Sequence, residues 1–392
     1  MNYVLFDSEV RTSLLPFTFT RPVGEIRIGI LTLREKWEKH LKSGTSYLTE
    51  EYLQIKYPLK SGPDTLYIDP SFLPDAELVR AVRALKAESA LFLDSVPIAY
   101  RSSKPRTASE LSELNKEQFQ GETIRIVHTW DIFSRNGEAL QQDFDLITAG
   151  RKSAPIPASN RVIRPENIFL EEGAKVELSI LNATEGPIYL GKDSEVMEGN
   201  MIRGAFALCE HGVVKMGAKI YGPTTIGPYG KVCGEINNSV IFGYSSKGHD
   251  GYLGNSVLGE WCNIGADSNN SNLKNNYAKV RLWNYATERF DQTGLQFCGL
   301  MMGDHSKTAI NTMFNTGTVI GVNCNIYTPG FPRNFVPSFS WGGAAGFSTY
   351  QTQKAFEAAK VMMERRGRTF DEKEAAILEH VFEITKKWRK YS

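Results

Sequence analysis

The sequence predicts three parts: an α/β domain, a left-handed parallel β-helix of hexapeptide repeats, and a pair of C-terminal α-helices. The β-helix is predicted by apolar residues that stand six apart without a break: Leu190, Val196, Ile202, Leu208, Val214, Ile220, Ile226 and Val232. Neither a helix nor a plain strand repeats every six residues, whereas one side of a hexapeptide β-helix does. The α/β domain is predicted by short apolar runs that alternate with helical patterns.

Composition limits the classes of function. The chain has 392 residues, a net charge of +1 and 41% apolar residues, as in a water-soluble globular protein without a basic field for nucleic acid. No apolar run reaches the length of a membrane span, and the acidic N-terminus is unlike a signal peptide. The cysteines, five in number, are scattered without a C-x-x-C pair, which argues against disulfides and zinc. We therefore expect a cytoplasmic protein that binds neither nucleic acid nor membrane.

Residues 1–150 are predicted to form the α/β domain, followed by a proline-containing linker at 151–164. Expected strands are Tyr3–Phe6, Thr65–Ile68, Ala90–Leu93 and Ile124–Ile126, in a mainly parallel sheet with helices on both faces. One helix is expected to start at Pro74 and Asp75, because Leu78, Val79, Val82 and Leu85 follow at helical spacing.

The β-helix is predicted to span residues 165–343. Glycines recur directly after inward residues, as in Leu190-Gly191 and Ile226-Gly227, where we expect corners with positive φ. Between about Asp267 and Leu300 the rhythm fails in an Asn-rich and aromatic segment, which is either a flap over a binding face or a packed surface loop.

Residues 344–392 are predicted to be helical, over Ser348–Arg366 and Asp371–Trp388. The second helix is expected to begin with a capping box at Thr369–Glu372. These helices are expected to cover the open end of the β-helix, or alternatively to pack against a neighbouring subunit.

One segment of the β-helix carries a specific motif. The sequence KGHDGYLGNSVLGEWCNIGA, from Lys247 to Ala266, resembles the acetyltransferase half of the bifunctional N-acetylglucosamine-1-phosphate uridylyltransferase/glucosamine-1-phosphate acetyltransferase family. The resemblance implies that His249 is the general base and that Tyr252 and Asn263 contact the amino-sugar phosphate. Imidazole suits this task because it can take a proton from an amine near neutral pH. The resemblance also implies that acetyl-CoA is the cosubstrate and that the chain forms a homotrimer, with the acyl-CoA bound between subunits.

The chain departs from the family pattern at several of these positions. The family's T-C-N-Y reads here as Asn270–Leu273, which keeps Asn272 as a substrate contact but replaces the tyrosine. The family's basic pair that grips the sugar phosphate falls at Asn237-Asn238 here, so the candidates are Asn237 and Lys215, which matches another basic residue of the family. The acceptor is therefore expected to be an amino-sugar 1-phosphate that need not be glucosamine 1-phosphate. His305 and Lys307, on an adjacent coil, are candidates for contacts to the acyl-CoA.

The N-terminal region is similar to the sugar nucleotidyltransferase half of the same family. Arg11, Pro16, Thr18 and Pro22 fit its R-x-x-P-x-T pattern, while the glycines of its phosphate-binding loop are absent and Val23 replaces a lysine. The resemblance makes Arg11 and Arg21 candidates for binding UTP or dTTP. Asp69 becomes a candidate ligand for Mg²⁺. The alternative is that Asp69 is only a turn residue before Pro70.

The whole chain resembles a divergent, Bacteroidetes-type branch of this bifunctional family with a reduced first domain. The resemblance predicts an acyl-CoA-dependent N-acetyltransferase in nucleotide-sugar biosynthesis of the UDP-N-acetylglucosamine type. Two alternatives stay open. In the first alternative, the N-terminal domain is the enzyme, a sugar-1-phosphate nucleotidyltransferase that uses UTP or dTTP, and the β-helix is a scaffold. In the second alternative, both activities are lost, and the chain binds sugar nucleotides or serves as an assembly platform.

Overall fold

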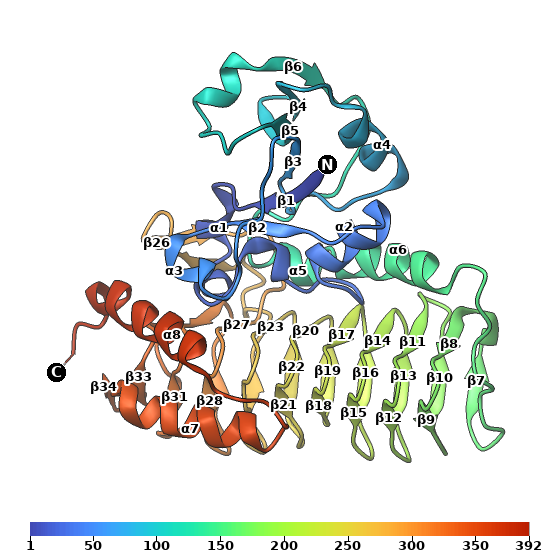
Figure 1. Cartoon of the computed structure of the whole chain (residues 1–392). Helices are drawn as coiled ribbons and strands as arrows, with labels where there is room; N and C mark the ends of the chain where they lie inside the picture. The colour runs from blue at the N-terminus through green and yellow to red at the C-terminus, as the bar shows by residue number, and fades with distance from the viewer. Residues whose placement is uncertain (392) are drawn as a thin grey trace. The chain divides into compact units, whose positions relative to one another are not determined.

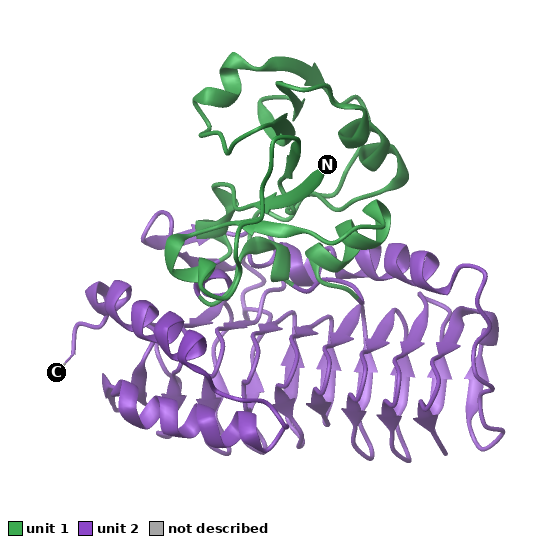
Figure 2. Ribbon diagram, in the orientation of Figure 1, with its two compact units in different colours: residues 1–14, 20–26, 31–128 green, residues 15–19, 27–30, 129–392 purple. Residues whose placement is uncertain are grey.

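The computed structural model describes residues 1–391 and divides into two compact units (Figure 2). Unit 1 holds residues 1–14, 20–26 and 31–128; unit 2 holds residues 15–19, 27–30 and everything from Thr129 onward. The helices α5 (Asp131–Ser134) and α6 (Asn136–Thr148) belong to unit 2. There the Asn136 side chain accepts from the Gly29 N–H at 2.8 Å and donates to the Pro223 carbonyl at 3.0 Å. The boundary between the units therefore follows His128, whereas the domain boundary predicted from sequence is residue 150.

Unit 1 is built on a six-stranded mixed sheet of order β2-β1-β3-β5-β4-β6 (Figure 1). Its strands are β1 (Asn2–Phe6), β2 (Ser46–Leu48), β3 (Thr65–Ile68), β4 (Ser89–Leu93), β5 (Val96–Ser102) and β6 (Asn115–Gln118). β5 pairs antiparallel with both β3 and β4, whereas the three other strand pairs are parallel, so the sheet is mixed with a parallel majority. The predicted strand at Ile124–Ile126 is wrong, since only Arg125 makes an isolated bridge, to Phe72.

Helices of unit 1 begin where side chains satisfy free backbone N–H groups. In α4 (Ala76–Ala84) the Asp75 carboxylate accepts from the Leu78 N–H at 2.7 Å, and this helix is confirmed as predicted. In α2 (Leu33–Leu41) Thr32 and Glu35 form a capping box. The remaining α-helices of the unit are the single turns α1 (Val10–Ser13) and α3 (Glu51–Gln54).

Unit 2 is a parallel β-helix whose coils present three faces, which confirms the predicted fold class together with unit 1 and the C-terminal helices. The first face holds β7 (Arg161–Ile163), β10 (Ile180–Asn182), β13 (Met201–Arg203), β16 (Lys219–Tyr221), β19 (Glu235–Asn237) and β22 (Tyr252–Gly254). The second face holds β8 (Ile168–Leu170), β11 (Ile188–Leu190), β14 (Phe206–Leu208), β17 (Thr224–Ile226), β20 (Val240–Ile241), β23 (Val257–Leu258), β27 (Leu300–Met302), β30 (Thr318–Ile320) and β32 (Phe335–Val336).

The third face is divided between early and late coils. The early coils contribute β9 (Lys175–Val176), β12 (Glu195–Val196), β15 (Val213–Val214), β18 (Lys231–Val232) and β21 (Ser246–Lys247). The late coils contribute β28 (Lys307–Thr308), β31 (Asn325–Ile326), β33 (Ser340–Gly343) and the antiparallel β34 (Gly346–Thr349). β7 lies inside the segment predicted as a linker, because its residues pair with β10 and start the first face.

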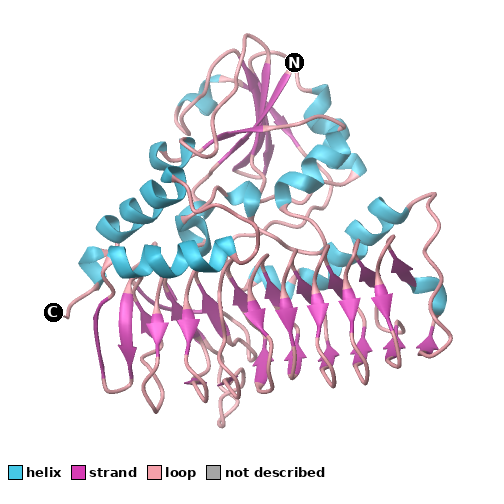
Figure 3. Ribbon diagram, turned by 60° about the horizontal axis from the view of Figure 1, so that its bottom comes forward, coloured by secondary structure: helices cyan, strands magenta, loops and turns pink. Residues whose placement is uncertain are grey.

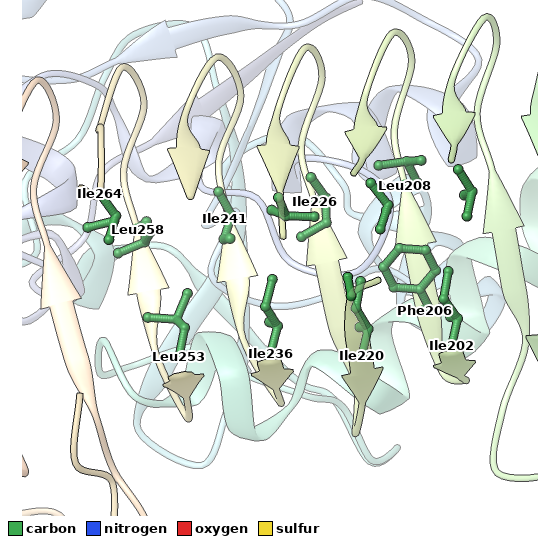
Figure 4. Close-up of a cluster of buried hydrophobic side chains, with 14 of the residues drawn as sticks. Ile202, Phe206, Leu208, Ile220, Ile226, Ile236, Ile241, Leu253, Leu258 and Ile264 are labelled. Carbon is green, nitrogen blue, oxygen red and sulfur yellow. The ribbon is translucent and has the colours of Figure 1, made fainter. Parts of the chain in front are cut away.

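The six-residue ladder is the core of the β-helix, as predicted. Ile202 pairs with Ile220 and Leu208 with Ile226, so residues 18 apart stack in successive coils. All members of the ladder are at most 2% exposed, and their side chains point into one continuous interior (Figure 4). Burial of such side chains provides roughly 1.5–3 kcal/mol each.

The corners differ from the expectation drawn from the glycines. The glycines that follow inward residues do not have positive φ; a Cβ at Gly227 would instead lie 2.6 Å from the Gly243 nitrogen of the next coil. Positive φ falls two residues after these glycines, at Asp193, Tyr229 and Trp261 among others. These glycines therefore serve the close approach of backbones between coils.

The predicted excursion contains a short strand and a hairpin. β24 (Asn269–Asn270) still follows the coil, and β25 (Arg281–Asn284) then pairs antiparallel with β26 (Arg289–Gln292). The Trp283 ring stacks on Phe335 with centroids 4.2 Å apart, and Tyr285 meets Trp388 edge-on. The hairpin thus packs on late coils and the C-terminal segment, which favours the packed loop over a flap above the Lys247–Ala266 motif.

The C-terminal helices are α7 (Thr352–Glu364) and α8 (Glu372–Ile384) (Figure 3). α8 is capped by Asp371, which accepts from the N–H groups of Lys373 and Glu374, rather than by the predicted box at Thr369. Phe382 packs edge-on against Phe339, and Arg368 reaches Tyr244 on a much earlier coil. The pair therefore lies along a corner of several coils and does not merely cover the end. Among residues 1–391, no helix is both long and apolar enough for a membrane span.

Candidate functional sites

The turn that joins β21 to β22 presents His249. Its side chain is exposed, while its backbone is held from inside the β-helix. The Lys247 ammonium donates to the His249 carbonyl at 2.7 Å and to the Asp250 carbonyl at 3.1 Å. The turn is therefore fixed by two charge-assisted hydrogen bonds, and the imidazole projects from a rigid support.

Lys247 occupies a ladder position that an aliphatic residue fills in the preceding coils. It pairs with Val232 and is 1% exposed. Burial lowers the pKa of Lys247 to about 8, with partial compensation from Cys233, Asp250 and Asp267. Sequence analysis missed this lysine because a charged side chain at an inward position looks like a break in the pattern.

We expect Lys247 to make stability depend on pH in the alkaline range. The unfolded lysine titrates near 10.4, so between pH 8 and 10.4 the unfolded chain binds more protons and stability rises with pH. The rise is at most about 3 kcal/mol from the size of the shift. Replacement Lys247→Met should flatten this rise in urea unfolding curves, whereas Lys219→Met, at an exposed position, should keep it. Parallel curves for the wild type and Lys247→Met would contradict the assignment.

Three of the predicted substrate contacts come together on the first face. Asn272 donates through Nδ2 to the Tyr252 hydroxyl at 2.9 Å and to Asn255 Oδ1 at 2.7 Å. Asn237 lies on β19, and its register partner on β22 is Gly254, two residues beyond Tyr252. Partial burial raises the pKa of Tyr252 to about 12, so its hydroxyl stays protonated and can donate to a sugar oxygen.

The same face carries two polar side chains that sequence analysis did not identify. The Tyr221 hydroxyl donates to Glu235 Oε1 at 2.6 Å, and Glu235 pairs in register with Tyr252. The signal was present, since Glu235 is an outward residue of the same strand as Asn237 and Tyr221 is the register partner of Asn237 on the preceding coil, but the resemblance gave them no role. Together these groups form a surface of hydroxyl, amide and carboxylate groups beside the His249 turn.

The other candidates lie away from the first face. Asn263 is exposed on the third face, bridged to Ser246 and Lys307. The Lys307 ammonium donates to the His305 carbonyl at 2.9 Å, and burial lowers the pKa of Lys307 to about 8. His305 is only 4% exposed and stacks beside Trp261. Lys215 projects along the third face toward the next coils, with its ammonium beside Gly248.

Unit 1 contains a pocket of about 700 Å³ at the carboxyl ends of β1 and β3. Its polar lining includes Asp7, Ser8 and Glu9 after β1 and Asp69 after β3. Basic side chains come from three further segments: Arg106, Lys116 and Arg125. Apolar walls are formed by Phe6, Leu48, Phe92, Val96, Pro97, Tyr100 and Leu111. A pocket with convergent charged groups at the ends of parallel strands is a typical ligand site.

Two buried carboxylates stand at the base of this pocket. Asp69 is fully buried, accepts from the Ser8 hydroxyl at 2.8 Å and lies 3.6 Å from the Arg125 guanidinium. Burial raises the pKa of Asp69 and raises that of Asp7 to about 6, although hydrogen bonds oppose both shifts. Arg125 beside Asp69 and Arg11 beside Asp7 offset only part of the effect of burial, so a divalent cation would stabilise both carboxylates further. No group of three or more His, Cys, Asp or Glu side chains suited to a metal occurs within residues 1–391.

The predicted nucleotide contacts Arg11 and Arg21 do not line this pocket. Arg11 donates to the Tyr52 hydroxyl at 2.7 Å and lies 3.6 Å from the Asp7 carboxylate. Arg21 is 5% exposed. The basic residues that do line the pocket were missed, because each stands alone in a loop or edge strand and no local pattern marks it.

Comparison with known proteins gives matches to both halves of the predicted resemblance. Residues 3–152 match the model of the sugar nucleotidyl transferase family. The bifunctional sugar-1-phosphate nucleotidylyltransferase/acetyltransferase of Sulfurisphaera tokodaii is 26% identical over 271 residues, which cover 66% of this chain and 60% of that protein. The bifunctional protein GlmU of Methanocaldococcus jannaschii is 32% identical over 90 residues, or 23% of this chain and 21% of that protein.

These matches show the class of protein to which the chain is similar, namely the sugar nucleotidyl transferases. They confirm the predicted resemblance to the bifunctional uridylyltransferase/acetyltransferase family. The chain spans about 60% and about 21% of the lengths of these two relatives.

Among solved structures, two UDP-N-acetylglucosamine acyltransferases match about 60% of this chain. The Francisella novicida protein is 12% identical with a TM-score of 0.21 over 76% of its length, and the Arabidopsis protein is 16% identical with a TM-score of 0.22 over 82%. The parallel strand pairing along three faces defines the β-helix of this chain by itself.

Proposed function

We propose that the chain is an acyl-CoA-dependent N-acetyltransferase that acts on an amino-sugar 1-phosphate and is fused to a sugar-1-phosphate nucleotidyltransferase domain. The main observation in favour of an acetyltransferase is the His249 turn, whose backbone is held by the buried Lys247 ammonium. This turn adjoins the hydroxyl group of Tyr252 and the amide groups of Asn272 and Asn237. The 26% identity to a bifunctional nucleotidylyltransferase/acetyltransferase supports it.

The chemistry assigns each group one task. The neutral amine of the sugar attacks the thioester carbonyl, and His249 accepts the proton as the C–N bond forms. The C–S bond then breaks, and the thiolate leaves and is protonated to the free thiol of coenzyme A. Tyr252 and Asn272 hydrogen-bond the sugar and orient its amine. Asn263 is proposed as a further substrate contact, with His305 and Lys307 on the donor side.

A homotrimer is part of this proposal. His249 and Tyr252 adjoin the first face, whereas Asn263 and Lys307 lie on the third face of the same chain. In a trimer, the first face of one copy and the third face of its neighbour would line a shared groove, which would bring these residues to one substrate. A groove of about 400 Å³ on the first face, lined by Ile180 and Met201, offers an apolar surface for that contact.

Nucleotidyl transfer is the second candidate function, favoured by the 700 Å³ pocket and the family match over residues 3–152. Arg106, Lys116 and Arg125 provide positive charge for the phosphates of UTP or dTTP. Asp69 and Asp7 would hold Mg²⁺, which supplies neutralisation of phosphate charge when bound.

A panel assay tests both functions. The protein is incubated with acetyl-CoA and several hexosamine 1-phosphates, with or without UTP, dTTP and Mg²⁺, and products are identified by mass spectrometry. We expect an N-acetylated sugar phosphate and, with nucleotide, a nucleotide sugar and pyrophosphate. Ligand-induced thermal shifts without any product would instead show a binding protein that has lost both activities.

A further inference from the structure

The pocket of unit 1 is lined by one acidic residue whose charge is not used by the fold. Glu9 follows the end of β1, lines the pocket and is exposed. Its side chain makes no capping hydrogen bond to α1, the helix that it precedes. Within residues 1–391, Glu9 forms no ion pair with a basic side chain. Its carboxylate is therefore available to a ligand of the pocket.

The other two acidic residues of the pocket have partners. Asp7 lies 3.6 Å from the Arg11 guanidinium, and Asp69 lies 3.6 Å from that of Arg125. Between Met1 and Tyr391, Glu9 does not join these two carboxylates in a group of three that could hold a metal ion. A cation held by Asp7 and Asp69 would thus leave the charge of Glu9 without a partner.

The pocket also has positive charge that is available to a ligand. The Nη2 atom of Arg125 is buried and has no hydrogen-bond partner in the part of the chain that the structure describes. The Lys116 ammonium lies 5.8 Å from the centroid of the Phe92 ring, and in the same described part it pairs with no carboxylate. One pocket of about 700 Å³ therefore offers both signs of charge.

These charges indicate which ligand fits. A nucleoside triphosphate or a neutral sugar 1-phosphate has phosphate groups for Arg125 and Lys116, but it has no cation for Glu9, which repels phosphate. An amino-sugar 1-phosphate with a free amine carries an anionic phosphate and, at neutral pH, an ammonium. Its N-acetylated form has a neutral amide in place of the ammonium. The free amine therefore complements the pocket better than the amide does.

We propose that Glu9 pairs with the ammonium of the acceptor sugar, so that unit 1 prefers an amino-sugar 1-phosphate whose amine is free. The proposal rests on the nucleotidyl transfer proposed above. In that reaction an oxygen of the sugar phosphate attacks the α-phosphorus of the nucleoside triphosphate, the bond to the β-phosphate breaks, and pyrophosphate leaves. The amine is unchanged. Acetylation need not come first, and the two proposed activities then draw on the same sugar phosphate.

The test compares the free-amine and N-acetylated forms of one hexosamine 1-phosphate as acceptors. Pyrophosphate release is measured with UTP or dTTP and Mg²⁺, without acetyl-CoA, so that the two forms do not interconvert. At pH 7 the wild type should have a kcat/KM about tenfold higher with the free amine, as expected for one hydrogen bond between charged groups. In Glu9→Gln the ratio of the two values should fall close to one.

Two control variants should keep the preference. Lys116→Gln removes a positive charge from the same pocket and should slow the reaction of both forms alike. Glu117→Gln removes an exposed carboxylate from the same strand, outside the pocket lining, and should change neither rate. Raising the pH through the pKa of the sugar amine should reduce the wild-type ratio, because a neutral amine no longer attracts Glu9. Equal melting temperatures exclude misfolding.

A wild-type ratio near one, a preference for the N-acetylated form, or an unchanged preference in Glu9→Gln would overturn the proposal. If neither form gives pyrophosphate, nucleotidyl transfer itself fails, and calorimetric binding of the two sugar phosphates in the presence of UTP decides about Glu9. A free-amine preference in binding that disappears in Glu9→Gln would support the Glu9 contact without the reaction. Equal binding of the two forms, or no binding, would overturn it.

Discussion

The variant His249→Ala is expected to lose acetyl transfer from acetyl-CoA to the sugar phosphate by about a hundredfold or more. The loss follows because the attacking amine must give up a proton as the C–N bond forms, and a positioned general base that takes this proton typically contributes at least this factor. The fold should be unaffected, since the side chain is exposed and the turn is held through its backbone by Lys247. Release of free thiol and the melting temperature measure the two effects.

Controls for this prediction lie next to the histidine. Asp250→Asn changes an exposed neighbour in the same turn and should leave the rate unchanged. Tyr252→Phe removes the hydroxyl that accepts from Asn272 and should mainly raise KM, because it acts on the sugar and not on the proton. A His249→Ala enzyme with the wild-type rate would rule out His249 as the base.

The β-helix was predictable because its signal is local and repeated. Each rung places one apolar residue inward, so eight regular positions define the coil before any contact is known. The role of the glycines was not predictable from one coil, since the atoms that exclude a Cβ at Gly227 belong to Gly243 on the next coil. Lys247 was missed for a different reason: a charged side chain at an inward position interrupts the apolar pattern, and the turn carbonyls that accept its hydrogen bonds are visible only in the folded chain.

The candidate site of unit 1 was less predictable. The predicted strand Thr65–Ile68 is confirmed as β3, and Asp69 directly follows its end. β5, in contrast, runs antiparallel after the two-residue turn Asp94-Ser95, where Asp94 has a φ of 53°. That strand changes the sheet from parallel to mixed. The basic residues of the pocket are brought together only by the tertiary fold, so spacing along the chain gives no sign of them.

The variant Asp69→Asn is expected to lower nucleotidyl transfer on the order of a hundredfold or more, because removing a ligand removes charge stabilisation from the reacting phosphates. The amide keeps the size of the side chain and its place beside Ser8, 2.8 Å away. Pyrophosphate release with UTP and a sugar 1-phosphate in Mg²⁺ measures the rate. Asp64→Asn, at an exposed carboxylate that pairs with Arg101, is the matched control and should retain it.

The free energy of unfolding of Asp69→Asn distinguishes cation binding by Asp69 from a purely structural role of this side chain. Burial raises the pKa of Asp69 in the folded chain, so the folded state binds more protons than the unfolded state and stability falls as pH rises above the ordinary carboxyl range. Asp69→Asn removes that penalty and should be as stable as the wild type at pH 7, or more so. Lower activity with equal or higher stability would identify a carboxylate kept buried for binding a cation. Equal activity, or lost stability at pH 7, would assign Asp69 to the turn after β3 instead.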